Sequence, residues 1–493
     1  MKKTFVSFFS LLLILNLVIP TAAASESYPD FDTAVIDTFI EEEMRTSRIP
    51  GLALGIVKNG EIAYLKSYGH AGNGRTLTPQ TPFLIGSLSK SFTAVTTMQL
   101  VEEGLLNLDT PVREYLPWFE MAGEYDVSTM TVRHLLVQTS GIPWNAGLTT
   151  LAEDSSLTLE EEIRALKDIA LAHPPGKEYI YSNTNYNILG LIVEKVSEQG
   201  YMAHVENDIF KPLEMQDSYL SKNDGIDGGM SEGHLKWFSF PVATDVQYLD
   251  NSLAAGFIIS SAEDLSRYLL MHLGEGSYKQ SMLLSETGAA ELHTPGEVTD
   301  GESEYAMGLV VREVDGASLV MHDGATQGFN SGMIFSPEDQ WGVVVLTNFA
   351  GQLELPAMGV ALGIADIMQG NSPETDSRTR KMVYLGLLML LITLIAFTIR
   401  SIILLPKKWA VKIKENRPRG FFPVFGRIVL PAGLELLVPY LIFIFIPAGA
   451  GFSIWNLFAL FHPDLVYSLL LLAALMLTKA LWRICLLFRI RSN

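Results

Sequence analysis

Gly51-Leu52-Ala53-Leu54-Gly55-Ile56-Val57-Lys58 is followed by Asn59-Gly60 and then by Glu61-Ile62-Ala63-Tyr64-Leu65. Two apolar runs on either side of Asn-Gly are the strongest short-range signal for a β-hairpin. We therefore expect a sheet to begin here, near the start of the chain.

Residues 87–290 differ in hydrophobic periodicity from the residues on either side. Helical periodicity dominates that region, in segments at about 92–106, 186–196, 202–210 and 262–273. Strand patterns return at 306–314, 318–321, 331–335 and 341–347, and a helix is expected at 353–368. The sheet must therefore combine both chain ends, which predicts an α/β sandwich with an all-helical subdomain beside it.

In the segment 92–106, Ala94, Val95, Met98, Val101 and Leu105 recur at helical spacing. This spacing predicts an amphipathic helix with a single buried face.

Composition excludes several classes of protein. The 493 residues are 48% hydrophobic and 18% charged, so part of the chain is expected in lipid. The net charge is −19, and after Lys381 the only acidic residues are Glu415, Glu435 and Asp464, so the preceding part is strongly acidic. Such a surface repels phosphates, and we expect no nucleic-acid partner. The single cysteine, Cys485, allows no intramolecular disulfide and no cysteine-based metal cluster.

The first 24 residues are typical of a secretory signal. Lys2-Lys3 precede the apolar run 5–19, and small residues lead to Ala24, after which we expect cleavage. An uncleaved N-terminal anchor is the alternative, although 15 residues are short for a bilayer.

Three later apolar stretches, about 382–405, 428–446 and 465–488, are expected to be transmembrane helices. Seven lysines and arginines lie within 406–427, which places that loop and the C-terminus in the cytoplasm. The chain then divides into a signal (1–24), an exported domain (25–370), a linker (371–381) and a membrane domain (382–493), which makes it a multi-pass protein of the cell membrane.

Glu435 and Lys479 fall inside two of these stretches at matching depths. We expect an interhelical ion pair, since intramembrane charges usually find partners. In the alternative, Lys479 extends to the interface and Glu435 is protonated or meets water.

Ser87 and Lys90 form the only Ser-x-x-Lys in the chain, at the start of a predicted helix. Three residues are almost one helical turn, so the amine can reach the hydroxyl. A serine is a weak nucleophile near pH 7 and needs such a partner to lose its proton.

Tyr181-Ser182-Asn183 precedes another predicted helix. A tyrosine beside a cationic lysine has its phenolate favoured and could act as a base. Asn183 could hold a substrate amide. The alternative is a loop tyrosine and a helix-capping asparagine.

His322-Asp323-Gly324-Ala325 ends a predicted strand, where the glycine would let a ligand approach the backbone closely. The other histidines show no metal-binding spacing, and no metal site is predicted. The acidic runs Glu41–Glu43 and Glu160–Glu162 are expected on solvated helix faces.

In order and context these motifs resemble the serine hydrolases related to class C β-lactamases, D-alanyl-D-alanine carboxypeptidases and penicillin-binding esterases. The matching segments are 83–94, 103–104, 108–109, 135–141, 174–190, 255–256, 264–265 and 322–329. The resemblance implies a β-lactamase/transpeptidase-like fold, in which helices flank an antiparallel sheet and an all-helical subdomain, here followed by the three expected transmembrane helices.

The same resemblance implies roles for individual residues. Ser87 would be the acyl-enzyme nucleophile, Lys90 and Tyr181 the proton-transfer pair, and Asn183 a substrate contact. The backbone N–H groups of Ser87 and Ala325 would form the oxyanion hole. His322 and Gly324 stand in the third motif, where β-lactamases of this type carry Lys-Thr-Gly.

That difference bears on the substrate, because a mostly neutral histidine attracts a carboxylate less than lysine does. Efficient β-lactamase action is therefore not expected. Gln138 stands where relatives commonly have histidine, and the sequence gives no mechanistic reason for it.

The resemblance extends to the membrane-bound D-amino-acid peptidases that activate precursors during export, on architecture alone. We predict a membrane-anchored extracytoplasmic serine hydrolase that needs no cofactor. Its substrates would be peptides, amides or esters with D-amino-acid character, with cell-wall peptides among the candidates. One alternative is a penicillin-binding sensor that acylates without turnover. The others are a β-lactamase and a non-catalytic wall-binding module.

Overall fold

The computed structural model describes residues 31–147, 157–197, 199–296, 304–314, 317–350, 356–373, 377–415, 422, 425–445 and 462–491. The expected signal at 1–24 lies outside these residues, as does most of the loop between the second and third apolar stretches.

An eight-stranded antiparallel sheet forms the centre of the domain that precedes the long apolar helices, in the order β10-β11-β12-β13-β14-β1-β2-β3. Strand β1 pairs with β2 on one side and with β14 on the other, so Leu54 is opposite both Lys66 and Val345. Both chain ends therefore share one sheet, as predicted. The strands are β1 (Gly51–Lys58), β2 (Glu61–Gly72), β3 (Arg75–Thr76), β10 (Glu304–Tyr305), β11 (Val310–Val314), β12 (Ala317–Thr326), β13 (Phe329–Ser336) and β14 (Trp341–Thr347).

The predicted hairpin is confirmed. Asn59 and Gly60 connect β1 to β2 with φ angles of 51° and 81°. A tight two-residue turn needs positive φ at both central positions, which asparagine and glycine tolerate better than other residues.

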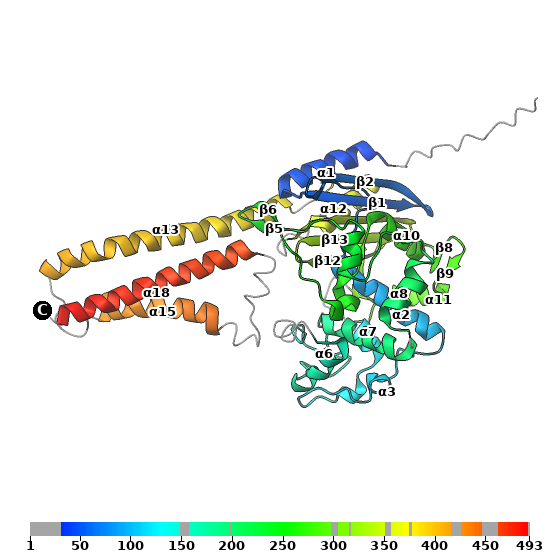
Figure 1. Ribbon diagram of the computed structural model, residues 1–493, viewed down its shortest axis with the longest axis horizontal. Helices are drawn as coiled ribbons and strands as arrows, with labels where there is room; N and C mark the ends of the chain where they lie inside the picture. The colour runs from blue at the N-terminus through cyan, green and yellow to red at the C-terminus, as the bar shows by residue number, and fades with distance from the viewer. Residues whose placement is uncertain are drawn as a thin grey trace, which may run out of the picture.

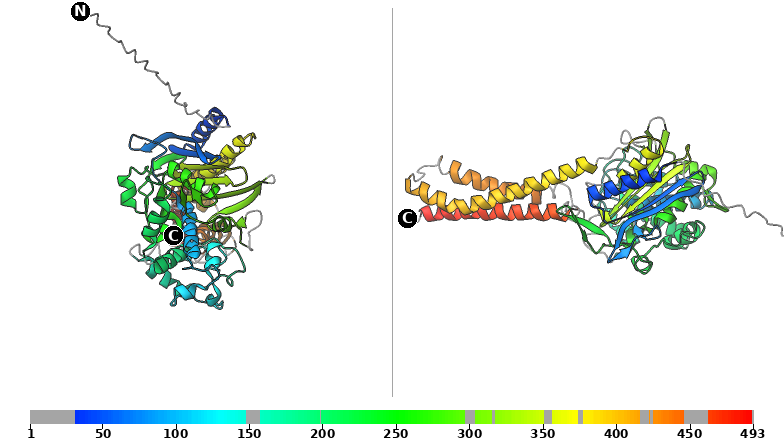
Figure 2. Two further views of the ribbon diagram at one scale, coloured as in Figure 1. Left: turned by 90° about the vertical axis from the view of Figure 1, so that its right-hand side faces the viewer. Right: turned by 90° about the horizontal axis from the view of Figure 1, so that it is seen from above.

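Helices cover both faces of the sheet (Figures 1 and 2). Helices α1 (Thr33–Ser47) and α12 (Pro356–Met368) bury one face, with Ile36, Ile40 and Ile364 in the shared core. Helix α10 (Ala262–Leu273) packs on the opposite face against β1 and β14. A second, larger core continues from that face into the helical subdomain.

The helical subdomain has α2 (Ser89–Glu102) at its centre. Every residue from Ser89 to Leu100 is buried, so the prediction of a single buried face is wrong for this helix. Several of its buried polar side chains are hydrogen-bonded, and Thr93 Oγ1, for example, donates to the carbonyl oxygen of Ala254 over 2.7 Å. The other elements include α3 (Val112–Tyr115), α4 (Val132–Leu136), α6 (Leu159–Ala165), α7 (Asn183–Ser197), α8 (Tyr201–Val205), η4 (Glu206–Phe210), α9 (Lys222–Asp227), η5 (Asp250–Ser252), η6 (Leu253–Phe257) and α11 (Glu286–Leu292).

Three apolar helical regions extend away from this domain side by side (Figure 1). Helix α13 (Ser377–Glu415) begins within the segment expected as a linker, and α18 (Pro463–Arg491) ends the described chain. Parts of these two, 377–407 and 463–485, are long and apolar enough to cross a membrane. The middle region contains α15 (Leu430–Tyr440), and its apolar helix spans only 430–444. Among the described residues two candidate spans are therefore found, where the sequence predicted three.

Glu435 on α15 lies 2.9 Å from Lys479 Nζ and 3.0 Å from Arg483 Nε, both on α18. The predicted ion pair is present, and Arg483 adds a second cation that the prediction did not include. Because Glu435 is almost fully buried, two cations around one carboxylate connect α15 to α18.

A short hairpin of the sheet-containing domain contacts these helices. Strands β5 (His234–Trp237) and β6 (Phe240–Ala243) form it, and β5 also pairs in parallel with β15 (Phe349–Ala350). The backbone N–H of Phe238 donates to Asp464 Oδ2 over 2.9 Å, and Trp237 stacks on Tyr467 with ring centres 5.7 Å apart. The beginning of α18 is therefore held against the β5–β6 hairpin.

Candidate active site

Ser87 lies in a single 3₁₀ turn, η1 (Gly86–Leu88), immediately before α2. The turn is fixed by Ser89, whose hydroxyl donates to the carbonyl oxygen of Gly86 over 2.7 Å and accepts from Ile258 N–H over 3.1 Å. Upstream, β4 (Phe83–Leu84) pairs with β7 (Ile259–Ser260). Ser87 is therefore positioned from both sides by backbone contacts within the helical subdomain.

The three residues predicted to act together converge. Lys90 Nζ donates to Ser87 Oγ over 2.9 Å, and the Tyr181 hydroxyl donates to the same oxygen over 2.9 Å. Lys90 Nζ also donates to the carbonyl oxygen of Ala255 over 2.6 Å and lies 4.9 Å from the centre of the Tyr181 ring. A nucleophile in direct contact with two proton-transfer groups is the arrangement that covalent catalysis needs.

Burial lowers the pKa of Lys90 to about 7, against a smaller opposite effect of the Asp323 carboxylate. The ammonium form is disfavoured because the side chain is fully buried. A substantial fraction of Lys90 is therefore neutral near pH 7 and can accept a proton.

Tyr181 shows the opposite behaviour to the one predicted. Burial raises the pKa of Tyr181 well above its usual value, and nearby Tyr305 and Asp323 act in the same direction. The expected phenolate is therefore not favoured, because desolvation outweighs the attraction of an amine that has itself lost much of its charge. Tyr181 keeps its proton, and its hydroxyl donates a hydrogen bond to Ser87 Oγ.

The loop that carries Tyr181 is held by Gln138. Its backbone oxygen accepts from Ile180 N–H over 2.9 Å, and its side-chain Oε1 accepts from Ser182 N–H over 3.0 Å. These two bonds fix the residues on either side of Tyr181. Gln138 is fully buried and has φ of 60°, in the left-handed region. It is therefore a positioning residue for the phenol, a role that its place in the sequence did not suggest.

Two glycines bring η1 against strand β12. A Cβ on Gly86, whose φ is 57°, would lie 2.5 Å from Ala325 N, and a Cβ on Gly324 would lie 2.0 Å from the Ile85 oxygen. Only glycine permits such an approach of two backbones. The result places Ala325 beside the turn that carries Ser87.

His322 lies on β12, behind Tyr181. It is buried, its ring centre is 6.2 Å from that of Tyr181, and its Nε2 is 3.4 Å from the Tyr305 hydroxyl. Burial lowers the pKa of His322, so the ring is neutral near pH 7. The structure places His322 behind the catalytic tyrosine and not on the wall of the pocket.

Ser87 opens into a cavity of about 180 Å³. Asn183 and Ala325, both predicted from the sequence, line this cavity, and Asn183 is exposed at the start of α7. The sequence analysis gave no role at the site to the other lining residues, which are Trp144, Gly147, Glu162, Thr184, Asn187, Gln247, Leu249, Ser252, Ala255, Gly256, Phe257, Thr326 and Gln327.

Glu162 corrects an expectation. It was assigned to a solvated helix face, yet only 3% of the residue is exposed. Glu43, in the other acidic run, is also buried, and its carboxylate accepts from the Ser377 hydroxyl over 3.1 Å. The sequence of three consecutive glutamates therefore did not show which of the three side chains is buried.

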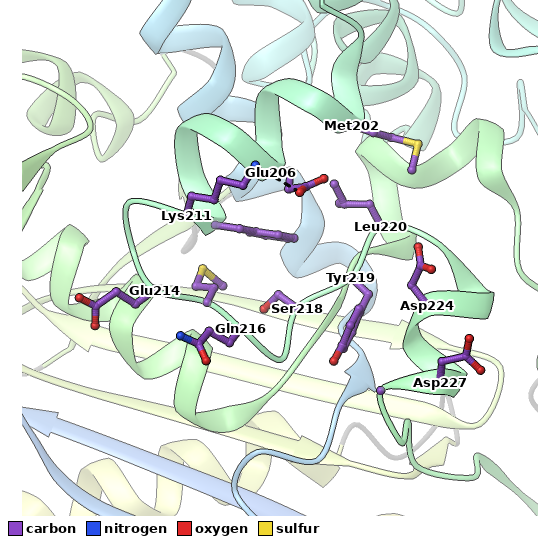
Figure 3. A pocket seen from close by; sticks show the side chains of 13 residues that line it. Met202, Glu206, Lys211, Glu214, Gln216, Ser218, Tyr219, Leu220, Asp224 and Asp227 are labelled. Atoms are coloured by element: carbon purple, nitrogen blue, oxygen red, sulfur yellow. Dashed lines mark ion pairs between the residues drawn. The ribbon is translucent and has the colours of Figure 1, made fainter.

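A wider cavity of about 700 Å³ lies elsewhere, over η4 and α9 (Figure 3). Two of its charged residues, Lys211 and Glu206, form an ion pair over 3.4 Å. Its serine, Ser218, is bonded to Asp264 and Ser260. Ser218 thus contacts a carboxylate and a serine, but no lysine amine or tyrosine hydroxyl is in contact with it among the described residues, and we assign the chemistry to the smaller cavity at Ser87. Among the described residues, no group of three or more potential ligands is placed to hold a metal ion.

Comparison with known proteins agrees with this geometry. A family model described as β-lactamase matches residues 36–360. Protein flp of Staphylococcus aureus (strain COL) is 32% identical over 321 residues, which are 64% of this chain and 62% of flp. The chain thus spans less than two thirds of that relative's length.

Two further matches cover more of the relative. Penicillin-binding protein 4 of Amycolatopsis lactamdurans is 30% identical over 325 residues, 62% of this chain and 83% of that protein. The octameric penicillin-binding protein homologue from Pyrococcus abyssi superimposes with a TM-score of 0.63 at 29% identity, over 71% of this chain and 81% of its own.

Proposed function

Because this chain belongs to the β-lactamase family of serine hydrolases, we propose that it is a membrane-anchored hydrolase that cleaves peptides, amides or esters of D-amino-acid character through an acyl-enzyme. The observation that carries the proposal is the contact of Ser87 Oγ with both Lys90 Nζ and the Tyr181 hydroxyl, each at 2.9 Å.

Acylation begins when neutral Lys90 takes the proton of Ser87 as Oγ attacks the substrate carbonyl carbon. The carbonyl oxygen becomes an oxyanion, stabilised by the backbone N–H groups of Ser87 and Ala325. Tyr181 gives its proton to the leaving nitrogen or oxygen as that bond breaks, and it regains one from the Lys90 ammonium. The products of this step are the free leaving group and a Ser87 ester.

Deacylation repeats the sequence with water. The amine of Lys90, neutral again, takes a proton from water as the oxygen attacks the ester carbon, and Ser87 Oγ leaves with a proton returned through Tyr181. The acid is released, and all three side chains return to their starting protonation.

The residues around Ser87 guide the choice of substrate. Asn183 supplies an exposed amide at the mouth of the cavity, suited to a substrate peptide group. His322 is buried and neutral, so it provides no cation for a substrate carboxylate. Two matched proteins are named for penicillin binding, which makes β-lactams sensible probes. We nevertheless expect β-lactamase activity to be weak, because the neutral histidine supplies no positive charge for the substrate carboxylate.

We place the catalytic domain outside the cytoplasmic membrane, where the lipid bilayer and cell-wall peptide would be its surroundings. Two apolar helices support the anchoring, and the cations of residues 406–427 support the orientation. This arrangement is similar to that of the exported D-amino-acid peptidases.

The full-length protein in detergent tests the proposal by labelling with a fluorophosphonate and a fluorescent penicillin. Ser87→Ala should remove all labelling and leave the melting temperature unchanged. Parallel assays with D-Ala-D-Ala peptides, acyl-D-amino-acid amides, short-chain esters and nitrocefin then identify the favoured class. Labelling that survives in Ser87→Ala would dismiss Ser87 as the nucleophile.

A second candidate is a sensor that acylates and signals through the membrane helices. It is favoured by the contacts of the β5–β6 hairpin, because Leu235 of this hairpin packs with Ala350 and Ala325 while its neighbour Trp237 stacks on Tyr467 of α18. The lifetime of the acyl-enzyme separates the two functions, since an enzyme turns over in seconds and a sensor persists for hours.

A further inference from the structure

Glu162 is a buried carboxyl group on the wall of the cavity that contains Ser87. It lies on α6, only 3% of the residue is exposed, and it shares the cavity with Asn183, Asn187 and Ser252. Burying an ionisable carboxyl costs free energy unless a cation or hydrogen-bond donors compensate. The surroundings of Glu162 therefore decide whether its role is structural.

The cations near Glu162 are already occupied. Arg164 on the same helix and Lys195 on α7 both bind Glu160, at 2.7 Å and 2.6 Å. In the described part of the chain, Glu162 Oε2 has no hydrogen-bond partner and no cation pairs with Glu162. Burial raises the pKa of Glu162 to about 7, opposed only by the nearby Asn187 amide.

The neighbouring polar groups extend the site. Asn187 lies one helical turn beyond Asn183 on α7 and donates to Ser252 Oγ over 3.2 Å. Its own Oδ1 is also buried and without a partner among the described residues. Two residues that line the same cavity thus each carry a buried acceptor that no described donor satisfies, which suits a ligand that brings several N–H donors.

A protonated amine is the chemical group that fits these acceptors. It carries a positive charge for Glu162 and three donors, enough for Glu162 Oε2 and Asn187 Oδ1 together. A carboxylate or an apolar group in the same place would leave both acceptors unsatisfied.

We propose that Glu162 binds a protonated amine of the substrate, so that the enzyme prefers substrates whose acyl part carries a free amino group. This specificity rests on the function proposed above, and it has two possible sources, the α-amine or a side-chain amine. A free α-amine would make the activity that of an aminopeptidase.

The test uses the full-length protein and two pairs of p-nitroanilides. D-Alanine p-nitroanilide is compared with its N-acetyl form, and Nα-acetyl-D-lysine p-nitroanilide with the norleucine equivalent. The readout is the ratio of kcat/KM within each pair, which cancels general losses of activity. Wild type should favour the amine at least tenfold in one pair, and that pair identifies the source of the amine.

Glu162→Gln should bring this ratio close to one without lowering the melting temperature, because it removes a charge that the folded protein leaves unpaired. Glu160→Gln, on the exposed face of the same helix, is the matched control and should keep the wild-type ratio. Glu162→Asp, which retains the charge, should keep part of the preference.

Several results would overturn the inference. A wild type without amine preference in either pair would do so even if Glu162→Gln failed to fold. So would a preference that persists in Glu162→Gln, or a lower melting temperature with an unchanged ratio. If wild type hydrolyses capped and uncapped members equally, the hydrolase function stands and only this inference fails. If neither pair is cleaved and Ser87 is not labelled, the proposed function itself fails.

Discussion

The acylation rate should depend on pH through Lys90. With a pKa of about 7, half of Lys90 is neutral at pH 7. At the usual pKa of 10.5 only about one molecule in 3,000 would be neutral there, so burial enlarges the neutral fraction on the order of a thousandfold. Only the neutral amine can take the Ser87 proton. Acylation should therefore rise about tenfold per pH unit below pH 7 and level off above it.

The assay is the second-order rate of fluorophosphonate labelling of the full-length protein from pH 5 to pH 9. The probe must be uncharged, so that the labelling rate does not depend on the charge of Glu162. The expected curve rises roughly 50-fold between pH 5 and pH 7.

Two variants test whether Lys90 is the group whose titration controls the labelling rate. Lys90→Arg should abolish labelling at every pH, because a guanidinium does not release its proton. Asp323→Asn should move the midpoint to lower pH, because the Asp323 carboxylate raises the pKa of Lys90. A rate that does not change between pH 5 and pH 9, a midpoint near 10, or a shift to higher pH in Asp323→Asn would refute the reasoning.

Three other predictions concern the supporting structure. Gln138→Leu leaves Ser182 N–H without its acceptor and should cost about 1–3 kcal/mol of stability, with a slower acylation that denaturation and labelling curves would show. Glu435→Gln should lower membrane accumulation measured by immunoblot, since it removes the charge that binds two cations of α18; an unchanged level would make the cluster unimportant. Burial lowers the pKa of His293 to about 4, so the unfolded state binds more protons between about pH 4 and 6.5, and stability should fall as pH drops through that window. His293→Gln should flatten the decline in melting temperature, and a wild-type curve without a decline would contradict the assignment.

The sheet and the central contact of the site could be predicted because their signals are local. The hairpin at Asn59-Gly60 follows from turn geometry, and the contact of Ser87 with Lys90 follows from helical spacing. The position of Tyr181 came from the family resemblance, since no local pattern joins residues 94 positions apart.

The features that the sequence analysis missed depend on which side chains are buried, and burial cannot be read from the sequence. Tyr181 keeps its proton because desolvation outweighs the neighbouring charge, and Glu162 turns inward from a run of three glutamates. Gln138 acts through one backbone and one side-chain bond to a distant loop. Each of these outcomes is decided by packing between segments that lie far apart in the chain.

The most direct test of the catalytic claim follows the intact mass of the full-length protein during reaction with a D-alanyl ester or thioester. The account predicts an acyl adduct on Ser87 that forms and disappears within seconds while product accumulates, and that is absent in Ser87→Ala. An adduct that persists for hours would make the protein a sensor. Product formed without any adduct on Ser87 would contradict the mechanism.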